Sequence, residues 1–240
     1  MKVIISYPLA FDAWEIFAPF ATRFCETFKK FGPGHSHYEV WAMCTFGEPT
    51  DAEKILFRGI KTQFVPYHAH GCDIGAAQKA GANCGSKDLV LAMTSRCYFH
   101  RYGWLKRYVE TRQKFGPGIY SASTSWEGGK AHCCTRAYMM DSELWQRYPL
   151  IVSSREEGQK FETGDWCVTS WAREYQLATG QVRWDGADEL MDSRRPELGG
   201  IFRRGEQNEV LVWDRHTDVY AEADATEKRR LEEMANPPNN

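Results

Sequence analysis

The sequence lacks the features by which several large protein classes are recognised. No apolar stretch approaches the roughly 20 residues needed to cross a bilayer, and the opening MKVIISYP is interrupted too early for a signal peptide. Neither G-x-G-x-x-G nor G-K-[ST] occurs, which disfavours Rossmann dehydrogenases and P-loop enzymes. Thirty basic and 32 acidic residues give a formal charge of -2, so no overall field attracts a polyanion. We therefore expect a soluble, cytoplasmic protein without a transmembrane segment.

The spacing of the eight cysteines excludes a common class of metal and redox sites. They form no C-x-x-C pair, which argues against a zinc knuckle or a thioredoxin-type site. Most are expected to be buried free thiols in a reducing compartment. What the chain does have is 240 residues with 42% hydrophobic content, enough to bury the core of one large α/β domain.

Short apolar runs alternate with helical stretches, which predicts an α/β fold around a largely parallel sheet. Strands are expected at residues 2–7, 38–46, 62–67, 88–93, 119–126, 133–134 and 209–213. Helices are expected at residues 12–31, 141–148, 164–177 and 223–235. Pro8 is expected to end the first strand, and the repeated KFGPG at Lys30–Gly34 and Lys114–Gly118 to stop two helices. Such sheets bind ligands beyond the carboxyl ends of their strands.

The segment Gly71–Leu105 carries the most informative order of landmarks. A small-residue run, AAQKAG at Ala76–Gly81, precedes a polar turn, a buried strand and then Thr94-Ser95-Arg96. In this order the segment resembles the GT-A glycosyltransferases, especially their large inverting family that uses nucleotide sugars. That family has an acidic D-x-D motif at the position of Thr94-Ser95-Arg96, so the motif is degenerate in this chain. The resemblance extends over residues 2–180 or so and rests on order.

The resemblance implies a fold and a domain plan. The fold would be a GT-A-like (Rossmann-like) three-layer sandwich with a mostly parallel central sheet and an acceptor-side extension. A single catalytic domain would span residues 1–222, with its nucleotide-sugar half at about 1–100 and its acceptor half at about 101–222. A charged helix and a disordered tail would follow at residues 223–240.

The activity implied is transfer of a sugar from a nucleotide-diphosphate donor to an acceptor hydroxyl, with inversion at the sugar. A catalytically inactive nucleotide- or glycan-binding relative and a nucleotidyltransferase are the alternatives. The acceptor is left open between a glycan, a protein and a modified DNA base, of which DNA is disfavoured by the balanced charge.

Such a transfer needs a carboxylate base for the acceptor hydroxyl and a group that neutralises the departing diphosphate. The segment Phe161–Trp171 resembles the family's E-D motif, which makes Asp165, near the start of a helix, the candidate base and Glu162 the reserve. Arg96 is the candidate partner of the diphosphate in place of a metal. Contacts to the nucleotide sugar are expected from Tyr7, Pro8, Glu48, Asp73, Gln78, Thr94 and Ser95.

Use of Mg²⁺ or Mn²⁺ is uncertain, because these ions prefer oxygen ligands and the degenerate motif offers no carboxylate. His216 and Asp218 in DRHTD are alternative metal ligands. His68, His70 and Cys72 in HAHGC have ligand chemistry that suits zinc, although a role in lining the donor site is favoured.

Overall fold

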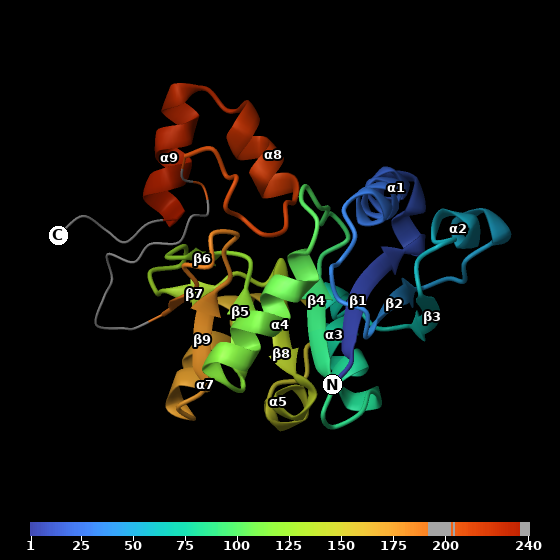
Figure 1. Ribbon diagram of the computed structural model, residues 1–240, viewed down its shortest axis with the longest axis horizontal. Helices are drawn as coiled ribbons and strands as arrows, with labels where there is room; N and C mark the ends of the chain where they lie inside the picture. Colours follow the sequence, from blue (N-terminus) through green and yellow to red (C-terminus); the bar gives the residue numbers. More distant parts are fainter. Residues whose placement is uncertain (192–202, 204, 236–240) are drawn as a thin grey trace.

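The computed structural model describes residues 1–191, 203 and 205–235 (Figure 1). In chain order the elements are β1 (Val3–Ala10), α1 (Trp14–Lys30), β2 (Tyr38–Thr45), α2 (Asp51–Leu56), β3 (Thr62–Tyr67), α3 (Cys72–Asn83), β4 (Leu89–Met93), α4 (Trp104–Phe115), β5 (Gly118–Ser121), β6 (Thr124–Ser125), β7 (His132–Cys133), β8 (Ala137–Asp141), α5 (Ser142–Arg147), α6 (Arg155–Glu162), α7 (Val168–Glu174), β9 (Ala178–Gln181), β10 (Glu189–Leu190), α8 (Arg215–Glu222) and α9 (Ala225–Ala235).

Among these residues the central sheet has eight strands in the order β10-β9-β5-β8-β4-β1-β2-β3. The pairs β1–β2, β1–β4, β2–β3 and β5–β9 are parallel. Strand β8 runs antiparallel between β4 and β5, and β10 runs antiparallel to β9. A separate two-stranded sheet pairs β6 with β7. The predicted α/β class with a mostly parallel sheet is confirmed.

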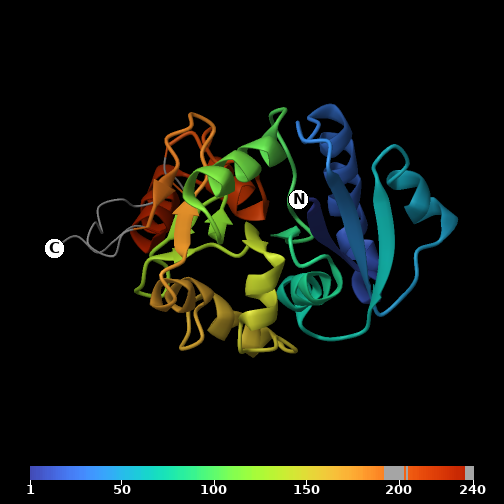
Figure 2. The same cartoon turned by 60° about the horizontal axis from the view of Figure 1, so that its bottom comes forward.

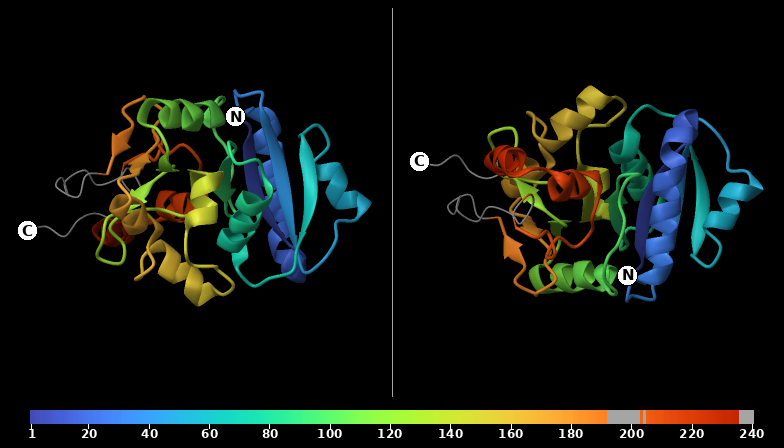
Figure 3. Two further views of the ribbon diagram at one scale, coloured as in Figure 1. Left: turned by 90° about the horizontal axis from the view of Figure 1, so that it is seen from below. Right: turned by 90° about the horizontal axis from the view of Figure 1, so that it is seen from above.

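Helices cover both faces of this sheet, as the alternation of side chains along β1 shows. Val3, Ile5, Tyr7 and Leu9 belong to a core shared with α1 and α4, whereas Ile4 belongs to a core shared with α3, α5, α6 and α7. Successive strand residues point to opposite faces, so one fully buried strand supplies both cores. Figures 2 and 3 show the resulting three layers.

The first strand does not end at Pro8, contrary to the prediction. β1 continues to Ala10 and stays in register with β2 over its whole length. Its pairing with β4 stops at Ser6. Pro8 therefore lies where one side of the strand is no longer paired, and a proline without an N–H is tolerated at such a position.

Three other segment predictions need correction. The run 119–126 divides into β5 and β6, and the helix predicted at 164–177 is only α7, because a turn at residues 163–167 separates it from α6. Residues 209–213 form no strand; they contribute only isolated bridges, Tyr98 with Trp213 and Arg183 with Val210. Val210, Leu211 and Val212 are buried, and a short buried apolar run has the same sequence pattern as a strand.

Both KFGPG segments do stop helices. α1 ends at Lys30 and α4 at Phe115, directly before Gly116, whose φ of 86° suits a residue without a Cβ. In the first copy Gly34 has a φ of 68°, and a Cβ there would lie 2.6 Å from Cα of Gly103. Gly34 is thus required both for its positive φ and for close packing of the chain against the start of α4.

The C-terminal helices α8 and α9 lie above the carboxyl ends of β4 and β5 (Figure 1). The charged helix expected near residues 223–235 is present as α9, while the tail expected at 236–240 lies outside the described residues. No helix in the described part of the chain has the length and apolar character needed to cross a membrane.

Candidate functional site

The turn after β4 contains Thr94, Ser95 and Arg96 and lies at the carboxyl edge of the sheet. The backbone N–H of Thr94 donates to the carbonyl of Arg136 (2.9 Å), and that of Cys97 donates to the carbonyl of Thr94 (3.2 Å). The hydroxyl of Tyr7 donates to the carbonyl of Ser95 (2.7 Å). The turn is therefore fixed between β1 and β8, at the position where the sequence order predicted it.

Arg96 leaves this turn on the α1 side of the sheet. Its guanidinium carbon lies 5.3 and 5.4 Å from the ring centres of Phe17 and Phe20, within the range of cation–π contacts. Its Nε is buried and has no hydrogen-bond partner within the described chain. A half-buried guanidinium of this kind retains donors for an anionic ligand.

The two candidate bases occupy different environments. Asp165 was expected near the start of a helix, but it lies in the turn before α7, whose N-cap is Cys167. Its side chain is exposed. Glu162 ends α6 and its Oε1 accepts a hydrogen bond from the backbone N–H of Thr135 (3.0 Å). The structure thus directs the reserve carboxylate, Glu162, toward the carboxyl edge of the sheet.

Charged and titratable groups surround Glu162. Its carboxylate acts electrostatically on Asp73, His132, Cys134 and Arg136. Burial lowers the pKa of His132, but a hydrogen bond with Cys134 and the nearby acidic groups outweigh burial and raise it to about 9. His132 is therefore a cation at neutral pH, and it lies within the electrostatic reach of Glu162.

Cys134 is a further group that sequence reasoning missed. Burial raises its pKa, but the charges of Arg136 and His132 and a hydrogen bond from His132 reverse that effect, so the pKa is lowered overall. The neighbouring Cys133 points into the opposite core and has a pKa raised to about 12, mainly by burial. Successive residues of an extended chain point to opposite faces, so the two neighbouring thiols have different surroundings and opposite pKa shifts.

Asp73 is the second residue of α3 and half-buried. Burial, with the charge of Glu162 adding to it, raises its pKa from 3.8 to about 6, although the first backbone N–H groups of the helix act in the opposite direction. The two carboxylates are therefore close enough to repel each other.

Folding stability should depend on this ionisation. Because the folded chain holds the proton of Asp73 more tightly than the unfolded chain, stability should fall as pH rises from about 4 to about 6. In Asp73→Asn this contribution is absent, so the urea midpoint should depend less on pH in that window, as measured by circular dichroism. Asp165→Asn, which removes an exposed carboxylate, should keep the wild-type slope. An identical slope in wild type and Asp73→Asn would contradict the shift.

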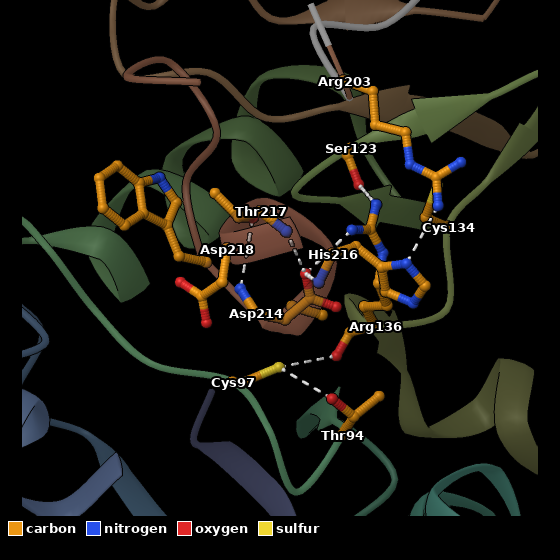
Figure 4. Close-up of polar contacts among 12 residues, drawn as sticks. Thr94, Cys97, Ser123, Cys134, Arg136, Arg203, Asp214, His216, Thr217 and Asp218 are labelled. Atoms are coloured by element: carbon orange, nitrogen blue, oxygen red, sulfur yellow. Dashed lines mark hydrogen bonds and ion pairs between the residues drawn. The ribbon is translucent and has the colours of Figure 1, made fainter. Parts of the chain in front are cut away.

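A buried ion pair lies behind the turn after β4 (Figure 4). Nη1 of Arg136 lies 3.1 Å from Oδ1 of Asp214, and Nη2 donates to Oγ of Ser123 at 2.6 Å. Oδ1 of Asp214 also accepts from the backbone N–H groups of His216 and Thr217 and so caps α8. One carboxylate therefore attaches the C-terminal helices to the sheet edge.

Three of the expected donor contacts have structural roles. Tyr7 is fully buried and stacks on Phe24 with ring centres 3.8 Å apart, and Pro8 is buried within β1. Both polar atoms of the Gln78 side chain are hydrogen-bonded. Its Nε2 donates to the carbonyl of Leu150 (2.6 Å), and its Oε1 accepts from the N–H of Val152 (2.8 Å). Glu48, by contrast, is exposed in the loop after β2.

The alternative metal ligands do not converge. Asp218 pairs with Arg23 (2.8 Å) and accepts from Tyr98, whereas His216 lies 3.1 Å from Nη2 of Arg203. His68 and His70 are exposed after β3, and Cys72 is exposed at the start of α3. The His70 ring is tilted by 36° against that of Phe46, with ring centres 4.7 Å apart. Within the described residues, no group of three or more His, Cys, Asp and Glu side chains is placed to hold a metal ion.

The sequence matches no protein-family profile and no curated protein. Solved structures with a similar fold include TarS from S. aureus in complex with UDP, at 11% identity and a TM-score of 0.48, covering 65% of this chain and 53% of that one. The mannosyltransferase PcManGT from Pyrobaculum calidifontis, in complex with GDP-Man and Mn2+, has 12% identity and a TM-score of 0.46, covering 66% and 51%. Mouse xyloside xylosyltransferase 1 has 9% identity and a TM-score of 0.43, covering 73% and 76%.

This chain therefore spans about half the length of the TarS structure. Two of the three neighbours are sugar transferases by name. At such identities and TM-scores, however, the similarities show neither the family nor the activity of this chain.

Proposed function

We propose that this chain transfers a sugar from a nucleotide-diphosphate donor to an acceptor hydroxyl. The observation that carries the proposal is Arg96, which follows β4 where the resemblance places the D-x-D motif and whose buried Nε has no hydrogen-bond partner within the described chain. Open α/β sheets bind ligands at this edge. A guanidinium with available donors suits a diphosphate, whose oxygens it contacts in bidentate fashion.

Charge divides the proposed site into two sides. Arg96, on the α1 side, would contact the diphosphate, with Thr94, Ser95 and Glu48 at the neighbouring strand ends. Glu162, on the α6 side, would take the proton of the acceptor hydroxyl. When a carboxylate acts as base in this way, the acceptor oxygen attacks the sugar from the side opposite the leaving group, which gives inversion.

The turn after β4 does not fit a divalent metal ion. It offers hydroxyl and carbonyl oxygens but no carboxylate, and Arg96 adds a positive charge. Oγ1 of Thr94 already lies 3.4 Å from Sγ of Cys97. Neutralisation of the diphosphate is therefore assigned to Arg96 and not to a metal ion.

The first test is binding of nucleotide sugars, measured as thermal shifts over a panel run with Mn²⁺ and with a chelator. At least one compound should raise the melting temperature, and the chelator should not abolish the effect. Stabilisation by none would refute the proposal. Stabilisation without release of nucleoside diphosphate would instead indicate a catalytically inactive relative.

Arg96→Ala should remove most of that thermal shift and lower turnover by about 10²-fold or more, because a charge-assisted contact to the leaving group is lost. The matched control is Arg58→Ala, an exposed arginine before the amino end of β3 and so at the opposite edge of the sheet. Equal effects of the two variants would exclude a specific role for Arg96.

A further inference from the structure

Asp73 and Glu162 place two carboxylates at the carboxyl edge from different elements. Asp73 belongs to the first turn of α3 and Glu162 to the last turn of α6, and both side chains are half-buried. The charge of Glu162 reaches the carboxyl group of Asp73. One oxygen of Glu162 is held by the N–H of Thr135, so its carboxylate is oriented by the main chain that leads into β8.

Tyr138 lies beneath this pair with an unsatisfied hydroxyl. The side chain is 1% exposed, and its ring packs between Trp145 and Phe161, with ring centres 5.5 and 6.1 Å away. Its hydroxyl has no hydrogen-bond partner among the described residues, although both carboxylates act on it electrostatically. A buried hydroxyl without a partner indicates that another group completes its hydrogen bonding.

The chemistry of these three groups selects the ligand. Two carboxylates accept hydrogen bonds and repel phosphate, so this part of the site suits a molecule that donates from several neutral groups. Carbohydrates meet that need through adjacent hydroxyls. A single serine or threonine hydroxyl satisfies one carboxylate only, and a nucleic acid would bring phosphates toward both.

We propose that Asp73, Glu162 and Tyr138 form a subsite for the hydroxyl groups of a carbohydrate acceptor. This inference rests on the proposed sugar transfer and names the class of its acceptor. Glu162 takes the proton of the reacting hydroxyl, Asp73 accepts a hydrogen bond from a neighbouring hydroxyl, and the Tyr138 hydroxyl pairs with the same sugar. Donor and acceptor then bind on the Arg96 side and the Asp73 side of the sheet edge, respectively.

The experiment measures binding of free disaccharides without a donor, by saturation-transfer difference NMR. Maltose, cellobiose, lactose and N,N'-diacetylchitobiose serve as probes, with a serine-containing tripeptide and a thymidine oligonucleotide as the other acceptor classes. At least one disaccharide should bind to wild type and to Asp165→Asn. Asp73→Asn should weaken that binding about 10- to 100-fold, since a hydrogen bond to a charged group is lost. Tyr138→Phe, which keeps the ring packing, should weaken it as well.

Each result decides the inference. Binding by no disaccharide, binding of the tripeptide or oligonucleotide alone, or equal disaccharide affinity in wild type and both subsite variants would overturn it. The nucleotide-sugar thermal shift reports separately on the proposed function. Donor stabilisation without disaccharide binding would remove the subsite alone, whereas disaccharide binding without donor stabilisation would leave a carbohydrate site and remove the transferase proposal.

Discussion

Glu162→Gln is expected to lower release of nucleoside diphosphate from the active nucleotide sugar by about 10²- to 10⁴-fold, the range typical of a lost general base. Glutamine keeps the size of the side chain and retains an oxygen that accepts from the N–H of Thr135. The fold and the placement of α6 should therefore be unchanged. The loss should appear in kcat, with a smaller effect on the KM of the donor.

Asp165→Asn is the matched control, because it removes a carboxylate three residues away that is exposed and belongs to no helix. Its turnover should stay within about threefold of wild type, as for most surface substitutions. A large loss in Asp165→Asn with normal turnover in Glu162→Gln would reverse the assignment and restore Asp165 as the base. Both variants should retain the wild-type melting temperature.

The sequence locates Glu162 and Asp165 in one short segment but does not predict which of the two side chains faces the sheet edge. The segment ETGD contains both residues, and the sequence gives no orientation for either. The turn through Gly164 decides it: a Cβ there would lie 2.7 Å from Cα of Lys160, so the chain folds back tightly after α6. Asp165 is thereby exposed, while Glu162 stays on the side that faces β7 and β8.

Several predictions that rest on local patterns were confirmed, although the strand end at Pro8 was not. The buried runs of β1, β2 and β4 and the two KFGPG stops depend on neighbours in sequence. Ala76, Ala77, Ala80 and Gly81 are all buried, and a Cβ on Gly81 would lie 2.5 Å from Cβ of Trp145. Close packing of α3 therefore explains these residues without reference to a ligand.

Features that rest on distant contacts were missed. Arg136 and Asp214 are 78 residues apart, and no local pattern links them. A local signal for α8 did exist: Asp214 is a preferred N-cap residue, and Thr217 completes a capping box with it. The segment 209–213 before it was interpreted as a strand, which concealed that signal.

Asp214→Ala is expected to lower the free energy of unfolding by about 5 kcal/mol. Loss of one partner of a buried ion pair costs about 3–5 kcal/mol, and loss of an N-cap about 1 kcal/mol. Both terms apply, since the 4% exposed carboxylate neutralises Arg136 and caps α8. Urea unfolding followed by tryptophan fluorescence measures the change. A loss under about 1 kcal/mol would contradict the buried pair.

Two further variants separate the charge from the cap. Asp214→Asn keeps an oxygen for the N–H groups of His216 and Thr217 but removes the charge, so it should be about 1 kcal/mol more stable than Asp214→Ala. Glu227→Ala breaks an exposed pair with Arg230 on α9 and should change stability by less than about 0.5 kcal/mol. If Asp214→Asn were as stable as wild type, the carboxylate would act only as a cap, and the charge of Arg136 would be compensated by its other contacts. The expected order places wild type and Glu227→Ala together, Asp214→Asn well below them and Asp214→Ala lowest, because burial makes the charge the larger of the two terms.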